Sequence, residues 1–366
     1  MPEQANRDGR GPGVEAAVGD NAPGLPTVSV IMPIRNEADF IERSIGSILA
    51  NDYPAEKLEV IVVDGMSSDG TRQIVARLAG DDPRIKVLDN PYRIVPHAMN
   101  AGIRIAKGQV LIRIDGHTLV EPNYISEAVR VLHEHGDACG AGGILETVAT
   151  TYVGRAIAAA MSNPVGVGAD NCRVGRPREG FVYDVPFPAY WRWVYDKVGL
   201  LDETLVRNQD DDLVQRVNQA GLKHYACPTI RSRYYSRASL RKLARQFYEY
   251  GFWRIRTLQK HKSPGQLRRV GPMVFVLLWL ALIVGGFFWW PLRWALAGYA
   301  GLYLLALIVG AVTAGRRFGW VLAPLVPVAI AIMHFAYGLG SLKGIWSWVI
   351  LRGRFVPPPE AHGTTR

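Results

Sequence analysis

VSVIMPIRNE (28–37) and LEVIVVDGMSSDGT (58–71) are the two stretches that decide the fold of this chain. Each begins with an almost unbroken run of β-branched and apolar residues, as expected of a strand that is covered on both faces. Each run ends in polar residues and is followed by a segment with helical spacing, and we expect Asn36 to cap the first helix. RIKVL (84–88) and QVLIRID (109–115) repeat the pattern. Strands that alternate with helices in this way predict a doubly wound, mostly parallel α/β sheet.

Ligands of such sheets bind just beyond the carboxyl ends of the strands, so the residues at these ends are candidate site residues. Asp64 ends the second run and could accept a hydrogen bond from a nucleobase, although a turn whose Ser and Asp residues cap the next helix explains it equally well. Asp115 and His117 follow the fourth run. They could hold a divalent cation against a diphosphate, with manganese suited better than magnesium, or form an ordinary polar turn.

A third acidic feature is the run NQDDDLVQRV (208–217), which places three consecutive carboxylates at the start of a helix. Pairing of Asp212 with Arg216, four residues on, accounts for one of them. Adjacent like charges raise one another's pKa and cost stability unless a cation or a function offsets them. The run is therefore a candidate site as well as a polar helix start.

The C-terminal third contains three stretches without any charged residue, each longer than the roughly 20 residues that a helix needs to cross a bilayer. They lie between Arg269 and Arg293, between Arg293 and Arg316, and between Arg317 and Lys343, and they exclude a purely soluble protein. A third straight span would leave Lys343 outside. Pro324 and Pro327 could instead break the third stretch into a re-entrant hairpin, with residues 346–351 flat in the interface.

Positive charge is concentrated just before the first of these stretches. Residues 231–269 contain 12 Lys or Arg against one acidic residue, whereas residues 1–230 contain 23 against 30. A polybasic segment beside a membrane helix is attracted to anionic lipid and marks the cytoplasmic side. This position favours a membrane surface over nucleic acid as the partner.

The motifs in this order closely resemble those of family 2 glycosyltransferases with the GT-A, Rossmann-like fold, from Thr27 to about Arg256. RIDGH, the RNQDDD form of the acidic motif and the hydrophobic C-terminal helices are most similar to the succinoglycan-biosynthesis ExoA branch. The resemblance implies a nucleotide-sugar donor and a divalent metal, Mn or Mg. By position it implies that five residues bind the donor: Pro33, Arg35, Glu37, Asp64 and Asp115. It implies metal binding by Asp115 and His117, and catalysis by Asp210 as general base. It also implies contacts to the acceptor or its phosphate by Tyr190, Asp211 and Arg254.

We therefore expect an inverting hexosyltransferase that moves glucose from UDP-glucose to a polyprenyl-diphosphate-linked saccharide. Two alternatives are a polyprenyl-phosphate hexose synthase and a non-catalytic subunit that binds nucleotide sugar in a polysaccharide assembly complex. The expected location is the plasma (inner) membrane, with several spans and a cytoplasmic catalytic domain. The expected divisions are a disordered tail (1–26), the GT-A domain (27–232), a basic juxtamembrane segment (233–269), the membrane helices (270–342), and an interfacial helix with a tail (343–366).

Overall fold

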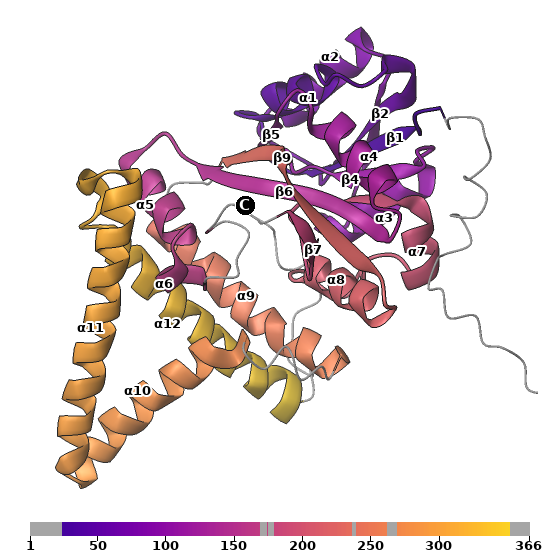
Figure 1. Cartoon of the computed structure of the whole chain (residues 1–366). Coiled ribbons are helices and arrows are strands. Elements are labelled where there is room, and N and C mark those ends of the chain that lie inside the picture. The colour runs from indigo at the N-terminus through magenta and orange to yellow at the C-terminus, as the bar shows by residue number, and fades with distance from the viewer. Residues whose placement is uncertain (1–23, 169–173, 175–178, 236–238, 262–268, 352–366) are drawn as a thin grey trace, which may run out of the picture.

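The computed structural model describes residues 24–168, 174, 179–235, 239–261 and 269–351 (Figure 1). The expected disordered tail and the end of the chain after Leu351 lie outside the described residues, apart from residues 24–26.

Four parallel strands form the first half of a single sheet. They are β1 (Val28–Ile34), β2 (Leu58–Asp64), β3 (Ile85–Asp89) and β4 (Val110–Arg113), arranged in the order β3-β2-β1-β4. β1 and β2 cover the residues predicted for them, and Ile34 lies opposite Asp64 in the register. The polar residues that follow β1 and β2 therefore meet at one edge.

The second half of the sheet continues from β4 and is mixed in direction. The remaining strands are β8 (Ala189–Trp191), β6 (Ala138–Val148), β9 (Lys223–Tyr235) and β5 (Thr118–Val120), in that order, with β7 (Gly180–Val182) paired to β9. β8 runs antiparallel to β4, whereas β6 and β9 are parallel to each other. β9 extends three residues beyond the expected end of the domain at residue 232.

Helices cover both faces of the sheet, which confirms the predicted fold class. The side chains of β1 alternate between two cores, with Val30 and Met32 facing one and Ile31 the other. α1 (Ile41–Leu49), α2 (Thr71–Asp81) and α4 (Tyr124–Glu134) contribute to the first core; α3 (Val95–Ile105), α7 (Arg192–Val198) and α8 (Gln209–Gln219) contribute to the second. A short 3-10 turn, Ala55–Lys57, precedes β2.

Asn36 does not cap α1, contrary to the prediction. The helix begins at Ile41 after Phe40, without a side-chain capping bond. Asn36 instead adopts a left-handed conformation with φ of 54°. Its backbone N–H donates to Ser67 Oγ at 2.8 Å, and its Oδ1 accepts from the Ser68 N–H at 2.9 Å. Asn36 thus joins the loop after β1 to the loop after β2.

The C-terminal part is helical. It contains α9 (Leu240–His261), α10 (Gly271–Phe288), α11 (Pro291–Phe318), a 3-10 turn (Trp320–Leu322) and α12 (Val326–Gly344), which continues as a π-helix through Ile345–Ile350. Two helices that lie between β6 and β7 in the sequence, α5 (Tyr152–Met161) and α6 (Pro164–Val167), pack against these C-terminal helices. α10, α11 and α12 with its extension are long and apolar enough to cross a membrane.

From Val326 onward the third apolar stretch is one continuous helix, preceded by the end of α11 and the 3-10 turn, so the predicted break into a re-entrant hairpin is wrong. Pro324 precedes α12, and Pro327 lies in its first turn, where the missing proline N–H breaks no helical hydrogen bond. α12 also differs from its two neighbours in its surroundings: 39% of its most apolar window is buried inside the protein, against 11% for α10 and 6% for α11.

Candidate active site

Two loops meet where β1 and β4 end, and they bring Glu37 and His117 together. Glu37 Oε1 lies 3.0 Å from His117 Nδ1, and both side chains are almost completely buried. Gly116 makes this approach possible, because a Cβ atom there would lie 2.9 Å from Glu37 Cγ. The predicted donor contact Glu37 therefore faces the imidazole ring, which it orients, rather than an open surface.

Asp64, the predicted base contact, is held in place at the end of β2. Its Oδ2 accepts from Arg72 at 2.9 Å and from the Ser67 N–H at 3.0 Å. Arg72 also pairs with Asp89, at the end of the neighbouring strand β3. Asp64, Arg72 and Asp89 all line one pocket beside α2. This arrangement can present a carboxylate edge to a planar polar group.

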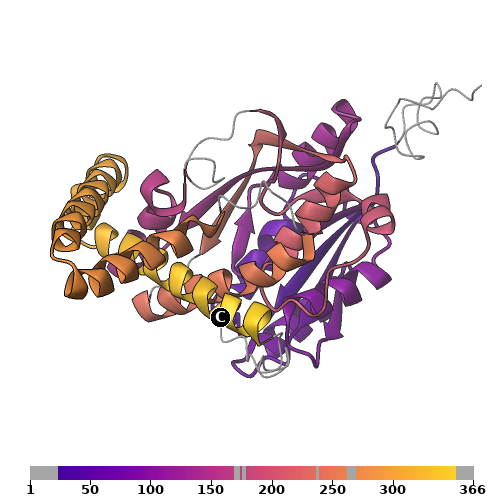
Figure 2. The same ribbon diagram turned by 90° about the horizontal axis from the view of Figure 1, so that it is seen from below.

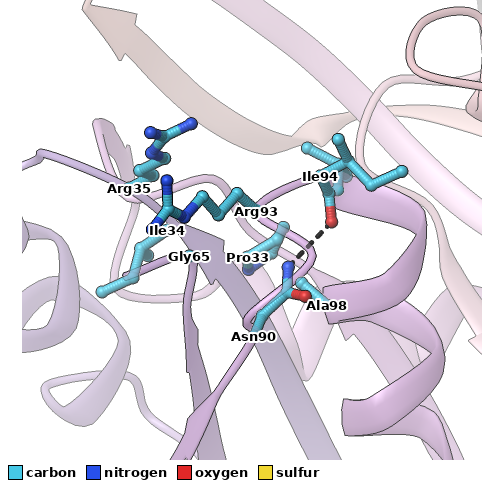
Figure 3. Close-up of a pocket in the computed structure, with 9 residues that line it drawn as sticks. Pro33, Ile34, Arg35, Gly65, Asn90, Arg93, Ile94 and Ala98 are labelled. Atoms are coloured by element: carbon cyan, nitrogen blue, oxygen red, sulfur yellow. Dashed lines mark hydrogen bonds between the residues drawn. The ribbon is translucent and has the colours of Figure 1, made fainter. Parts of the chain in front are cut away.

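Pro33 and Arg35 line a second, small pocket on the other side of the same strand ends (Figure 3). Arg93, which the sequence reasoning missed, lines it too. Burial and the neighbouring Arg93 charge lower the pKa of Arg35, while Asp64 partly offsets them. Two adjacent guanidinium groups create a positive potential that suits an anionic group such as a diphosphate.

Arg113 connects the loop after β4 with the acidic helix. It pairs with Asp115 at 2.9 Å. Burial opposes the Arg113 charge, but the nearby carboxylates of Asp115 and Asp210 outweigh it and raise the guanidinium pKa. Asp115 and Asp210 are 95 residues apart in sequence, yet both act on the same buried arginine.

The three acidic residues at the start of α8 lie in three different environments. Asp212 is fully buried and contacts Arg216, Lys260 and His261 at 3.0, 2.8 and 2.7 Å. Asp211 is paired with Arg254 and Arg269. Asp210 is exposed, and its Oδ1 accepts the Asp211 backbone N–H at 3.0 Å. The predicted Asp212–Arg216 pair is present, and further cations offset the charge of Asp211 and Asp212.

Of the predicted acceptor residues, Asp211 and Arg254 lie together beside Asp210, but Tyr190 does not lie on the surface. It is 2% exposed, and its hydroxyl lies 2.6 Å from His224 Nε2. The position of Tyr190 on the central strand β8 points its ring into the core, against Gly140. The acceptor contact predicted for Tyr190 is therefore incompatible with its position.

The donor atoms of Asp115 and His117 fit a divalent ion in part. A histidine that donates Nδ1–H to a carboxylate has its Nε2 oriented for metal binding. Within the part of the chain that the structure describes, no group of three or more His, Cys, Asp or Glu side chains could enclose an ion. Phosphate oxygens and water would have to complete the coordination, as they commonly do for magnesium.

Several residues of the site escaped the sequence reasoning. Arg113 could have been found, because residues two apart on a strand share a face and Asp115 was already a candidate. Arg93 and Arg269 carry no such local signal. The same holds for Asp184, which interacts electrostatically with Asp210, Arg254 and Arg269.

Comparison with known proteins identifies the family. The family described as Glycosyl transferase family 2 matches residues 29–156. The succinoglycan biosynthesis protein ExoA of Rhizobium meliloti (strain 1021) is 31% identical over 85% of this chain and 92% of its own length. The chain belongs to glycosyltransferase family 2.

Two further comparisons cover most of the chain. A glycosyltransferase of Methanococcus voltae is 24% identical, over 87% of this chain and 97% of its own; it is named for the transfer of a diacetamido-dideoxy-glucuronosyl group to dolichyl N-acetylglucosaminyl phosphate. The structure of the mannosyltransferase PcManGT from Pyrobaculum calidifontis, in complex with GDP-mannose and Mn²⁺, has a TM-score of 0.54 and 20% identity, and the match covers 88% of each chain. It confirms the GT-A fold of this family 2 enzyme.

Proposed function

We propose that this glycosyltransferase moves glucose from UDP-glucose to a saccharide carried on a polyprenyl diphosphate, with inversion at the anomeric carbon. The observation that carries the proposal is the difference among the three carboxylates of α8. Asp211 and Asp212 are each offset by cations, whereas Asp210 is exposed and lies near enough to Arg113 to act on its charge. Asp210 is therefore available to a substrate at the strand ends.

Asp210 acts in this proposal as the general base. An acceptor hydroxyl gives its proton to the Asp210 carboxylate while its oxygen forms a bond to the anomeric carbon. The bond from that carbon to the diphosphate oxygen breaks at the same time, and the electron pair leaves with the nucleoside diphosphate. A positioned base of this kind contributes about 10² to 10⁴ in rate.

The donor occupies the ends of β1, β2 and β4. Asp64 accepts a hydrogen bond from the nucleobase of the donor. Arg35 and Arg93 offset the negative charge of its diphosphate. A bound divalent ion would add Lewis-acid stabilisation of the leaving group. Asp115 and His117 are the residues that would hold this ion, and Glu37 keeps the His117 ring in position.

The acceptor approaches from the α9 side. Arg254 extends from α9 to Asp211 and supplies a guanidinium that can bind phosphate. One relative supports a lipid-linked saccharide as acceptor, since it is named for an acceptor on dolichyl phosphate, and another is named for the biosynthesis of a polysaccharide, succinoglycan. This reaction would take place at the cytoplasmic face of the plasma membrane.

The test is transfer by the full-length protein in membranes, with a panel of radiolabelled nucleotide sugars and a lipid extract that contains polyprenyl-diphosphate saccharides. We expect lipid-extractable label from UDP-glucose, and loss of this label with Asp210→Asn. Mild acid should release a labelled oligosaccharide. Release of labelled glucose alone would support a polyprenyl-phosphate acceptor, and nucleotide binding without any transfer would support the non-catalytic alternative.

A further inference from the structure

α12 begins and ends on the same side of the α10–α11 hairpin. At its start, Val326 packs in one apolar cluster with Ala314, near the C-terminal end of α11. In its second half, Gly338 touches the carbonyl of Pro272 and the side chain of Val276, in the first turns of α10. The end of α11 and the start of α10 lie on one side of the hairpin, while the turn that joins the two helices lies at the far end (Figure 1).

The rest of α12 lies along α9, which precedes the hairpin. The two helices run in the same direction side by side in Figure 1, and in the view from below they lie across one another at an angle (Figure 2). Gly340 of α12 faces Tyr248, and a Cβ atom there would lie 2.0 Å from the Tyr248 carbonyl oxygen. Eight residues on, the Trp348 carbonyl accepts from Gln259 Nε2 at 3.3 Å. Such backbone contact is typical of helix pairs with small residues at the interface.

α9 cannot lie in the hydrocarbon core, because its charged side chains bind the catalytic domain. Arg254 contacts Asp211, Lys260 contacts Asp202 and Asp212, and Glu249 contacts Arg207. An Arg or Lys at the centre of a spanning helix strongly opposes its insertion into hydrocarbon. Since α12 is packed against α9 over the same length, it shares the position of α9 relative to the membrane.

We propose that α10 and α11 cross the membrane and that α12 lies in the plane of the inner leaflet beside α9. The partner of this two-helix platform is an anionic lipid surface. Four exposed apolar residues of α12 and its extension would enter the acyl boundary: Leu339, Trp346, Val349 and Ile350. Three exposed basic residues in the first turns of α9 would face the lipid headgroups: Arg241, Lys242 and Arg245.

This arrangement also accounts for the distribution of positive charge. With two crossings, Lys343, Arg352 and Arg354 stay on the same side as Arg316 and Arg317. Three crossings would place these two groups on opposite sides and break the positive-inside tendency. The inference rests on the membrane placement proposed above and does not depend on the donor or the acceptor.

The test is the sidedness of three epitope tags on the full-length protein: at the N-terminus, between Trp290 and Pro291, and after Arg366. Protease is added to inverted and to right-side-out membrane vesicles. We expect both terminal tags to be cleaved in inverted vesicles and the tag in the hairpin in right-side-out vesicles. Terminal tags on opposite faces, or all three tags on one face, would overturn the proposal.

A second measurement guards against a tag that disturbs the hairpin. Trp290→Cys, in a variant whose three native cysteines are replaced by serine, should react with a membrane-impermeant maleimide in right-side-out vesicles and not in inverted ones. The opposite pattern would overturn the proposal. Transfer is assayed in the same vesicles, so a protein with the expected topology and no transfer would refute the proposed function and leave the topology standing.

Discussion

Glu37 Oε1 and His117 Nδ1 lie 3.0 Å apart in a contact that joins the ends of β1 and β4 away from solvent. The contact fixes which nitrogen of the His117 ring carries the proton and how the ring is oriented. It thereby leaves Nε2, the other ring nitrogen, oriented to bind a metal ion. Its consequences can be measured separately from those of Asp210, the proposed base.

Glu37→Gln should raise the Mn²⁺ concentration required for half-maximal transfer by about 10- to 100-fold, which is the usual effect of losing a group that orients a metal-binding histidine. The measurement is a Mn²⁺ titration of transfer in membranes. Glu42→Gln is the matched control, because Glu42 lies on the exposed side of α1 and pairs with Arg77. An unchanged Mn²⁺ dependence in Glu37→Gln would contradict the assignment.

Removal of divalent ions should abolish transfer, and Mn²⁺ should restore it at least as well as Mg²⁺. His117→Asp should shift the preference toward Mg²⁺, because magnesium favours an all-oxygen set of ligands. The measurement is the ratio of the rates with the two ions after chelation. Full activity in excess chelator would refute the roles proposed for Asp115 and His117.

Asp210→Asn should lower the transfer rate by about 10² to 10⁴ while nucleotide affinity stays near the wild-type value, because the substitution removes basicity and keeps the shape. Asp212→Asn should lower the melting temperature instead, since it leaves Arg216, Lys260 and His261 around a neutral side chain. Rates and nucleotide affinities are compared across Asp210→Asn, Asp211→Asn and Asp212→Asn. If Asp210→Asn kept most of the rate and one of the others lost it, the base would be the other residue.

Gly340→Ala should destabilise the protein and lower its activity. The added methyl group would meet the Tyr248 carbonyl, and forced overpacking typically costs 1 to 3 kcal/mol. Gly301→Ala is the matched control: Gly301 lies within α11, and a Cβ there meets nothing within 4 Å. Both proteins are melted in detergent and assayed for transfer. Equal melting temperatures for the two variants would show that α9 and α12 are not in backbone contact.

His224 should make stability fall as the pH is lowered from about 6.5 to about 4. Burial lowers the pKa of this ring to about 4, although a backbone hydrogen bond opposes the shift. Between the folded and unfolded pKa values the unfolded chain binds the additional proton, so acid favours unfolding. His224→Gln should therefore lose less stability than the wild type between pH 7 and pH 5. If the melting temperatures of the wild type and of His224→Gln fell equally between pH 7 and pH 5, His224 would not be the cause of the acid sensitivity.

The sequence allowed prediction of the features that depend on local pattern. β1 and β2 are continuous β-branched runs, and the Asp212–Arg216 pair follows from its four-residue spacing. The Glu37–His117 contact depends on how β1 and β4 align, which no local pattern encodes. The cations beside Asp211 lie 43 and 58 residues away in sequence. Hydropathy identified the apolar stretch of α12 but could not reveal that α9 covers part of it.

Arg254 connects the acidic helix α8 with α12, because its Nε donates to the Tyr337 hydroxyl of α12 at 3.2 Å while another of its nitrogens contacts Asp211. α12 follows the α10–α11 hairpin in the sequence, so the contact between Arg254 and Tyr337 requires that the chain has passed through the hairpin. If the hairpin crosses the membrane as proposed, insertion and completion of the charged cluster around Asp211 are linked, because Arg254 gains its contact with Tyr337 only when α12 has docked.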